Sequence, residues 1–262
     1  MRRFDADYLE TTRRGMWADA RDALADMDLP GRERVLDVGC GTGVLTRVLR
    51  EEAAGTVVGL DADRGLLADV APPTLQGDAT RLPVRDGAFD LVACQALLVN
   101  LPDPVAALRE FARASADLVA VVEPDNAAVT VESTVEREPP LARRARRLYR
   151  AGIDTDAALG SSAPDLFRAA DLSVVSTRRY DHVRETAPPY SASAVETARR
   201  TATGAGLADD RAELLAGDVD AEEYDALRES WREMGRAVVE QMRAGDYERT
   251  ETVPFYVTVG RV

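Results

Sequence analysis

The sequence predicts an α/β fold in which a parallel sheet is covered by helices on both faces. Short apolar runs alternate with amphipathic helical segments between residues 31 and 125, and short links join them. This alternation is typical of a doubly wound sheet. The runs are nearly continuous in apolar residues, as in strands that are buried on both sides. A length of 262 residues suits one large domain with insertions.

The spacing of apolar residues distinguishes helices from strands along the chain, and so gives the order of the elements. An amphipathic helical segment at residues 1–30 comes first, and strands and helices then alternate. The predicted strands are residues 34–39, 56–61, 73–78, 89–95 and 117–124, and the predicted helices are residues 42–53, 62–71 and 103–115.

The alternation ends near residue 125, and the rest of the chain reads as insertions into the core. The predicted organisation is an N-terminal helical segment (1–30), a ligand-binding core (31–125), a helical insertion (126–160), a core helix with a sixth strand (161–183), a helical cap (184–250) and a final core strand (251–262). The insertion holds a basic helix at 135–152, whose interspersed arginines are typical of a solvated face.

The charge of the chain limits its partners. The formal net charge is −13. The chain has no lysine, so all of its Lys and Arg positions are arginine. An acidic surface repels polyanions, which disfavours a broad nucleic-acid interface. Acidic, lysine-free composition resembles that of proteins from halophilic archaea with GC-rich genomes, although GC bias alone is the alternative. At molar salt the Debye length falls to about 3 Å, which weakens the charge argument against nucleic acid.

Membrane and metal functions find no support in the sequence. No run approaches the roughly 18 apolar residues of a membrane span, and the N-terminus lacks the apolar region of a signal peptide. We therefore expect a soluble, cytoplasmic protein. Two cysteines, Cys40 and Cys94, and a single histidine, His182, form neither a disulfide framework nor a metal-ligand spacing.

Three glycines follow the first predicted strand. Gly39, Gly41 and Gly43 lie in the turn that leads into the first core helix. Glycines permit a tight turn and let a ligand approach the main chain, and the amides of a helix N-terminus are free to bind it. A simple packing turn is the alternative. The position at the carboxyl end of a strand in an open α/β sheet favours a nucleotide-like ligand.

Carboxylates at neighbouring strand ends sharpen this prediction. Asp37 lies inside the first strand, Asp61 ends the second and Asp78 closes the third. Asp61 follows the glycine loop at nearly the same distance along the chain as the acidic residue that binds the ribose in dinucleotide-binding folds. A carboxylate there accepts both ribose hydroxyls, and Asp78 is placed to accept from an adenine amino group.

Four segments, in this order and spacing, closely resemble class I S-adenosylmethionine-dependent methyltransferases of the small-molecule branch, which includes quinone and sterol methyltransferases. They are "VLDVGCGTG", "VVGLDAD", "GDATRLPVRDGAFDLV" and "ALLVNLPDPVAALREFAR". The likeness covers about residues 30–125 and is weaker at 160–182 and in the final strand. It implies a Rossmann-like, doubly wound seven-stranded sheet whose last strand is antiparallel, with helical cap insertions.

The resemblance also implies roles for individual residues around S-adenosylmethionine. Asp37 would stand near the amino-acid end, Asp61 would bind the ribose, and Tyr8 would close over the cofactor. The remaining implied contacts are Gly39, Cys40 and Gly41 along the methionine moiety, Ala62, Asp78 and Ala79 around the adenine, and Gln95 and Ala96 after the fourth strand.

The catalytic residues stay unassigned. The donor carries an activated methyl group, so positioning and exclusion of water can suffice, and a base is needed only if the acceptor must lose a proton early. Glu123 and His182 are the candidates, with Tyr180 and Tyr190 nearby in sequence. Relatives often carry histidine in the segment "NLPDP", where this chain has Asn100, so a base there is unsupported.

The insertions leave the sheet at its carboxyl edge, so we expect a lid over a small organic acceptor. Three alternative functions remain: a non-catalytic cofactor-binding partner or sensor, a tRNA-modifying methyltransferase, and a nicotinamide-dependent oxidoreductase. The oligomeric state is open between a monomer and a homodimer. The spacing Gly-x-Gly-x-Gly and Asp78 disfavour the oxidoreductase.

Overall fold

The computed structural model describes residues 12–13, 15–18, 20–217 and 219–262. The chain forms two compact units. Unit 1 comprises residues up to Asp125 together with Ala157–Tyr180 and Pro254–Val262, and unit 2 comprises Asn126–Asp156 and Asp181–Val253. Each unit is considered on its own below.

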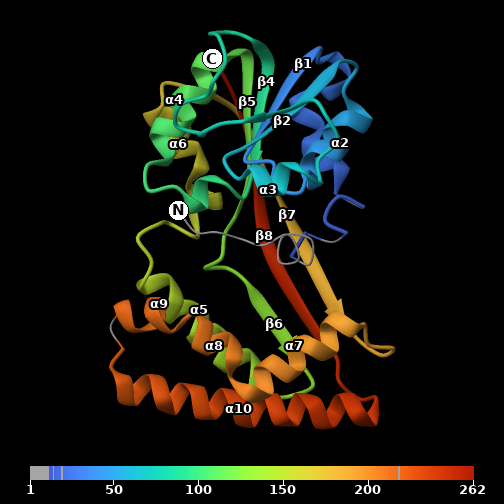
Figure 1. The fold of residues 1–262 in the computed structure, drawn as a ribbon, viewed down its shortest axis with the longest axis vertical. Coiled ribbons are helices and arrows are strands. Elements are labelled where there is room, and N and C mark those ends of the chain that lie inside the picture. The colour runs from blue at the N-terminus through green and yellow to red at the C-terminus, as the bar shows by residue number, and fades with distance from the viewer. Residues whose placement is uncertain (1–11, 14, 19, 218) are drawn as a thin grey trace. The chain divides into compact units, whose positions relative to one another are not determined.

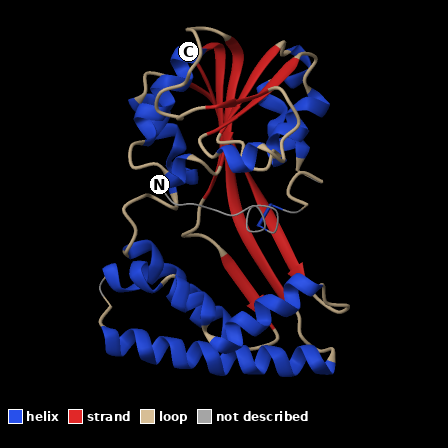
Figure 2. Cartoon of the chain, in the orientation of Figure 1, coloured by secondary structure: helices blue, strands red, loops and turns tan. Residues whose placement is uncertain are grey.

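The described residues form an eight-stranded sheet in the order β3-β2-β1-β4-β5-β8-β6, with β7 also paired to β8 (Figures 1 and 2). Strands β1 to β5 are parallel to one another, and β8 is antiparallel to β5 and β6. The strands are β1 (Arg34–Val38), β2 (Thr56–Asp61), β3 (Thr74–Gln76), β4 (Phe89–Gln95), β5 (Ser115–Pro124), β6 (Thr130–Ser133), β7 (Ser173–Thr186) and β8 (Arg249–Arg261).

The register of the parallel strands decides which residues meet at their carboxyl ends. Val38 of β1 lies opposite Leu60 of β2 and opposite Cys94 of β4. The next residues along these strands are Gly39, Asp61 and Gln95, so they leave the sheet at the same edge. This edge of unit 1 carries the candidate site.

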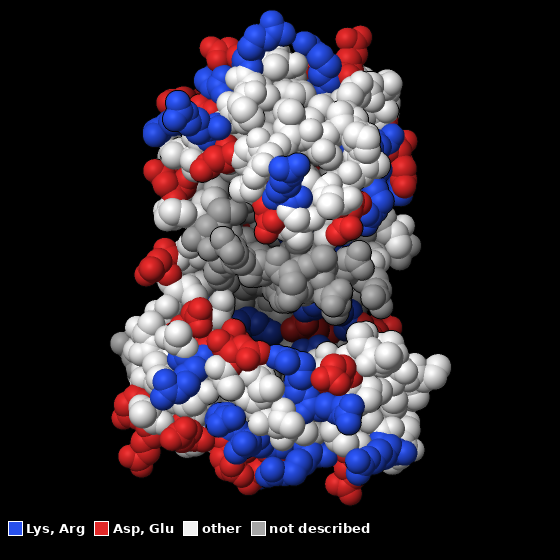
Figure 3. All heavy atoms as spheres, viewed as in Figure 1, with Lys and Arg blue, Asp and Glu red and all other residues white. Residues whose placement is uncertain are grey.

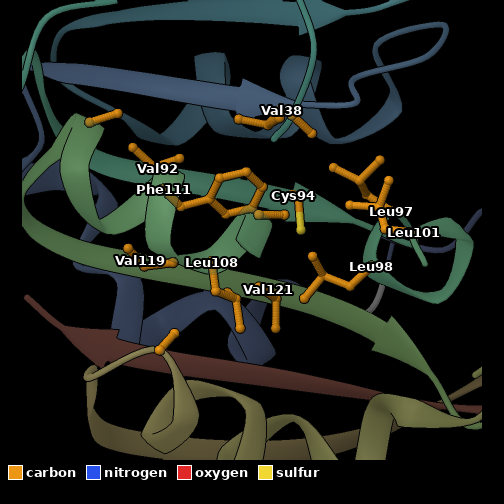
Figure 4. Close-up of a cluster of buried hydrophobic side chains, with 14 of the residues drawn as sticks. Val38, Val92, Cys94, Leu97, Leu98, Leu101, Leu108, Phe111, Val119 and Val121 are labelled. Atoms are coloured by element: carbon orange, nitrogen blue, oxygen red, sulfur yellow. The ribbon is translucent and has the colours of Figure 1, made fainter. Parts of the chain in front are cut away.

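Helices cover both faces of the parallel strands, with α2 and α3 on one face and α4 and α6 on the other (Figure 1). Phe111 and Leu108 of α4 are completely buried and pack toward Val119 and Val121 of β5 (Figure 4). The helical elements of unit 1 are η1 (Arg21–Met27), η2 (Leu29–Gly31), α2 (Val44–Glu52), α3 (Arg64–Leu67), η3 (Leu98–Asn100), α4 (Pro104–Ala114), η4 (Leu159–Ser162) and α6 (Ala163–Ala169), where η marks a 3-10 helix.

Unit 2 is mainly helical and has its own buried clusters. Its longest helix begins with a capping box, in which the Asp220 side chain accepts from the Glu223 amide and the Glu223 carboxylate accepts from the Asp220 amide. Leu214, Leu227 and Met234 form part of the buried apolar set. Its helices are α5 (Glu138–Ala151), α7 (Ala192–Thr203), α8 (Ala205–Asp209), α9 (Arg211–Ala216) and α10 (Ala221–Ala244).

The predicted fold class is confirmed, but the sheet has eight strands in the described part of the chain where seven were expected, and other details also differ. Strand β6 was not predicted, because its sequence "TVES" is short and mostly exposed. The third strand ends at Gln76, so Asp78 follows it rather than closing it. The N-terminal segment forms the 3-10 helices η1 and η2 among its described residues, not one long helix, and the final strand begins earlier, at Arg249. No helix in the described ranges is long and apolar enough to cross a membrane.

Substitution of Gly235 by alanine is expected to destabilise the protein. A Cβ at Gly235 in α10 would lie 2.4 Å from the backbone nitrogen of Ala202 in α7, which cannot move aside easily. Overpacking of this kind costs about 1–3 kcal/mol, which exceeds the gain of about 1 kcal/mol from alanine in a helix. Gly206→Ala is the control because no heavy atom lies within 4 Å there. Thermal unfolding should show a lower midpoint for the first variant and an equal or higher one for the second. Equal stabilisation by both would contradict the close α7–α10 contact.

Candidate functional site

The glycine loop adopts a backbone conformation that requires its glycines. Gly39, Gly41 and Gly43 have φ values of 67°, 55° and 79°, a region that other residues rarely adopt. A Cβ at Gly39 would also lie 2.8 Å from the Leu97 side chain. The backbone amide of Cys40 donates to the carbonyl of Leu60 at 2.9 Å, which ties the loop to β2.

Asp61 holds this loop from the end of β2. Its Oδ2 accepts the Gly41 amide at 2.9 Å, and its Oδ1 accepts the Asp63 amide at 2.8 Å. Only 8% of Asp61 is exposed. A carboxylate offers about four acceptor positions, so two backbone bonds leave room for two hydroxyl donors. Asp61 therefore fixes the loop and keeps capacity for a ligand.

Asp37 is buried beneath the loop with one hydrogen-bond partner among the described residues. Its Oδ2 accepts from the Thr46 hydroxyl of α2 at 2.6 Å, while its Oδ1 is buried without a partner there. Burial raises the pKa of Asp37 to about 7, and the Thr46 hydrogen bond and the charge of Arg13 oppose this rise. The unmet oxygen is a place for a donor group of a ligand.

Gln95, at the end of β4, is covered by the N-terminal segment. Its Oε1 accepts from the Trp17 indole at 3.3 Å, its Nε2 contacts the Met16 sulfur at 2.7 Å, and its carbonyl accepts from Arg13 at 3.5 Å. Ala96 follows with a φ of 48°, which turns the chain sharply away from the sheet. Sequence reasoning missed Trp17, Met16 and Arg13, because no motif surrounds them.

The residues predicted at the adenine lie on the more exposed side of this edge. Asp78 is exposed, and its Oδ1 accepts both the amide and the hydroxyl of Thr80, which lowers its pKa. Ala79 is buried and Ala62 is exposed. Tyr8 lies outside the described residues.

Glu123 near the end of β5 is completely buried and bound to backbone amides. Its Oε1 accepts from Leu97 at 3.0 Å and Leu98 at 2.8 Å, and its Oε2 accepts from Val99 at 3.4 Å. Burial raises its pKa to about 7 against the effect of these amides. These bonds join both oxygens of Glu123 to the start of η3. The contacts therefore favour a role in holding the loop after β4, and not a role as a base. Asn100 serves the same turn by donating to the Ala96 carbonyl at 2.9 Å.

The other candidate base and one of the two tyrosines belong to unit 2. His182 is a buried residue of β7. The Tyr190 hydroxyl donates to the Tyr247 carbonyl and accepts the Tyr247 amide, each at 3.0 Å, so both its functions are occupied.

Tyr180 belongs to unit 1 and forms part of an aromatic row. Its ring centroid lies 5.4 Å from that of Trp17 and 5.6 Å from that of Phe255. Its hydroxyl is buried without a partner in the described part of the chain, and burial raises its pKa well above the usual value. The row meets the edge of the sheet through Trp17, whose indole donates to Gln95 Oε1.

Comparison with known proteins agrees with this geometry. Residues 36–117 match a family model described as "Methyltransferase domain". A demethylmenaquinone methyltransferase of Mycolicibacterium paratuberculosis is 45% identical over 87 residues, covering 32% of this chain and 37% of the relative. One from Lactiplantibacillus plantarum is 33% identical over 132 residues, covering 45% and 53%. The match thus spans about half or less of these relatives' length.

Solved structures extend the likeness to the whole fold. A methyltransferase candidate from Bacillus halodurans C-125 has a TM-score of 0.54 at 14% identity, covering 93% of this chain and 98% of its own. A Haloferax volcanii methyltransferase candidate, solved with the Trm112 methyltransferase activator, has a TM-score of 0.52 at 20% identity, covering 98% and 94%. The fold is therefore the Rossmann-like methyltransferase fold.

The fold and the methyltransferase domain imply S-adenosylmethionine as cofactor, and the residues present fit it. The left-handed glycines leave the backbone of the loop open to a close ligand. The buried Oδ1 of Asp37 lacks a partner within the described structure, which suits an ammonium donor. Asp61 retains acceptor capacity for hydroxyls.

Substitution of Asp37 by asparagine is expected to change how stability depends on pH. In the unfolded chain the pKa of an aspartate is about 3.9, whereas burial raises that of Asp37 to about 7. The folded state therefore binds the proton more tightly, so this contribution to stability is fully present below about pH 4 and lost as the pH rises to about 7. The slope is at most about 1.4 kcal/mol per pH unit.

Urea unfolding between pH 4.5 and 7.5 measures this effect. The advantage of the wild type over Asp37→Asn should shrink as the pH rises, while the exposed control Asp69→Asn should differ from the wild type by a constant amount. Parallel curves for the wild type and Asp37→Asn would show that the buried carboxyl does not titrate in this range.

Proposed function

We propose that the chain is an S-adenosylmethionine-dependent methyltransferase that acts on a small organic acceptor. The observation that carries the proposal is the joint placement of the left-handed glycine loop, the buried Asp37 and the loop-bound Asp61 at one edge of the parallel sheet. Residues 36–117, which match the methyltransferase domain, contain all three features.

In this proposal each residue at the sheet edge has a separate part in holding the cofactor. Asp61 accepts the ribose hydroxyls, and Asp37 faces the amino-acid end. The remaining contacts are Gly39, Cys40 and Gly41 along the methionine moiety, Ala62, Asp78 and Ala79 around the adenine, and Gln95 and Ala96 beside the donor. Burial raises the pKa of the Cys40 thiol, which keeps it neutral beside a cationic ligand.

The chain contributes orientation and exclusion of water. When bound, the sulfonium donor supplies a methyl group that is already activated, so alignment with the acceptor can account for much of the rate. Glu123 keeps the loop after β4 in place through three backbone amides. Trp17, Tyr180 and Phe255 provide an apolar wall, and the neutral Tyr180 hydroxyl is available to a polar atom of the acceptor. His182 remains a second candidate for a proton acceptor.

The acceptor is proposed to be small and enclosed, with the insertions at 126–160 and 184–250 as its lid. The relatives named demethylmenaquinone methyltransferases support a small-molecule acceptor. The net charge of −13 disfavours RNA, and on the face in Figure 3 acidic and basic side chains are interspersed. A cytoplasmic location at high salt, in a halophilic archaeon, completes the proposal.

Substitution of Asp61 by asparagine is expected to weaken binding of S-adenosylhomocysteine at least tenfold. Hydrogen bonds to a charged acceptor contribute about 1.5–3 kcal/mol each, and about 1.4 kcal/mol corresponds to a factor of ten. Calorimetric titration compares the wild type, Asp61→Asn and the exposed control Asp69→Asn, with NADH as a second ligand. Binding of NADH in place of S-adenosylhomocysteine would favour the oxidoreductase, and unchanged affinity in Asp61→Asn would contradict the ribose assignment.

Transfer of a labelled methyl group identifies the class of acceptor. The protein is incubated with methyl-tritiated S-adenosylmethionine and a cell extract, which is then separated into small molecules, RNA and protein. Label is expected in the small-molecule fraction. Label in RNA would support the tRNA-modifying alternative, and no transfer despite tight cofactor binding would support a sensor or partner protein.

Stability is expected to depend on salt. The uncompensated negative charge repels itself over a Debye length of about 10 Å at 0.1 M salt, which shrinks to about 3 Å at 1 M. The unfolding midpoint should therefore rise steadily between 0.1 and 3 M KCl, more than in a neutral osmolyte of equal osmolality. Full stability at 0.1 M would refute the halophilic adaptation.

A further inference from the structure

A cluster of arginines in unit 2 has no part in the site described so far. Arg146 of α5, Arg184 of β7 and Arg249 of β8 all form ion pairs with the carboxylate of Glu251, and we call these three residues the arginine cluster. The Nη2 atoms of Arg146 and Arg249 lie 3.0 Å and 3.3 Å from its Oε1, and Arg184 donates to its Oε2. Three strong donors thus share a single small acceptor.

The arginine cluster carries more positive charge than its partners neutralise. Glu138, the second carboxylate in contact with it, accepts from Arg249 Nε at 2.9 Å and also from the hydroxyls of Ser133 and Tyr247. Within the described structure, three guanidiniums therefore share two carboxylates. This excess of positive charge lies in a chain whose net charge is −13.

The electrostatic surroundings of Arg146 show the same imbalance. Burial lowers its pKa, and the nearby guanidiniums of Arg249, Arg184 and Arg150 lower it further, while Glu251 opposes them. A buried cation without full compensation is costly, so a further anion would stabilise this group.

The arginines also keep hydrogen-bonding capacity that the protein does not use. Arg184 Nε is buried without a partner in the described part of the chain, although a guanidinium has five donors. The arginine side chains are 23–30% exposed, whereas those of Glu138 and Glu251 are 10% exposed. An anion that approaches from solvent therefore meets guanidinium groups more readily than carboxylates.

We propose that the arginine cluster binds an oxyanion, a carboxylate or phosphate group carried by a small ligand. The planar fork of a guanidinium matches both groups in geometry, and charge-assisted hydrogen bonds of this kind are the stronger ones in proteins.

The test measures thermal unfolding with three aromatic probes of similar size at constant ionic strength. Phenyl phosphate and benzoate represent the two anions, and benzyl alcohol is the neutral comparison. The wild-type midpoint should rise by roughly 5 °C at about 100 times the dissociation constant of the better anion, and benzyl alcohol should leave it unchanged. The anion with the larger shift identifies the class.

Two variants decide whether the arginine cluster is responsible. Arg184→Gln leaves Glu251 paired with Arg146 and Arg249, and it should lose most of the anion-dependent shift. The control is Arg178→Gln on the same strand, whose guanidinium pairs with Asp26, and it should keep the shift. Arg146→Gln provides an independent repeat, and the midpoint without ligand shows whether each variant is folded.

The proposal is overturned if neither anion raises the wild-type midpoint, if benzyl alcohol acts equally well, or if Arg184→Gln and Arg146→Gln respond like the wild type. Titration of the same variants with S-adenosylhomocysteine keeps the two proposals apart. Loss of the anion response with normal cofactor binding supports the arginine cluster. Absence of cofactor binding in the wild type would refute the methyltransferase and leave the anion result intact.

Discussion

The loops at the carboxyl edge of the sheet are held by carboxylates that stand at or near the ends of neighbouring strands. Asp61 of β2 accepts the Gly41 amide from the loop after β1, and Glu123 of β5 accepts three amides from the loop after β4. Each carboxylate thus fixes the turn that follows the adjacent strand. Without these bonds, buried amides would lack partners, at a cost of about 1–3 kcal/mol for each one.

Glu123 and Asp61 differ in how many acceptor positions their carboxylates keep for a ligand. Glu123 is completely buried, and three amides and the Cys94 thiol donate to its carboxylate, which offers about four acceptor positions. Asp61 accepts one amide on each oxygen and so keeps acceptor positions. Asp37 is the third case, with one oxygen on Thr46 and the other without a partner among the described residues. Acidic side chains at this edge therefore differ in how much hydrogen-bonding capacity the protein itself uses.

The sequence predicted those parts of the molecule that local patterns determine. The strands at 56–61 and 89–95 match β2 and β4, because continuous apolar runs bounded by polar residues have clear limits. The glycine loop was also predictable, since left-handed φ values at Gly39, Gly41 and Gly43 leave little choice of residue. Strand β6 was not, because four residues with little burial carry no periodic signal.

The contacts that tertiary packing creates could not be read from the sequence. Trp17 and Gln95 are 78 positions apart, and no motif links them. Glu123 was a candidate base because the end of a parallel strand faces the ligand crevice. Only the three-dimensional contacts show that its oxygens are bound to backbone amides. Position along a strand thus predicts which edge a side chain lies on, but the neighbouring loop decides what the side chain does there.

The two units satisfy their buried carboxylates in different ways. In unit 1 the partners are uncharged, backbone amides for Glu123 and the Thr46 hydroxyl for Asp37, and burial raises the pKa of both carboxyl groups to about 7. In unit 2 the partners are guanidiniums, and these hold the pKa of Glu251 below its ordinary value although burial opposes them. A buried carboxyl group with uncharged partners can take up a proton near neutral pH, whereas one surrounded by arginines stays charged. Unit 1 therefore keeps two buried carboxyl groups that can be protonated near neutral pH, while Glu251 of unit 2 stays charged.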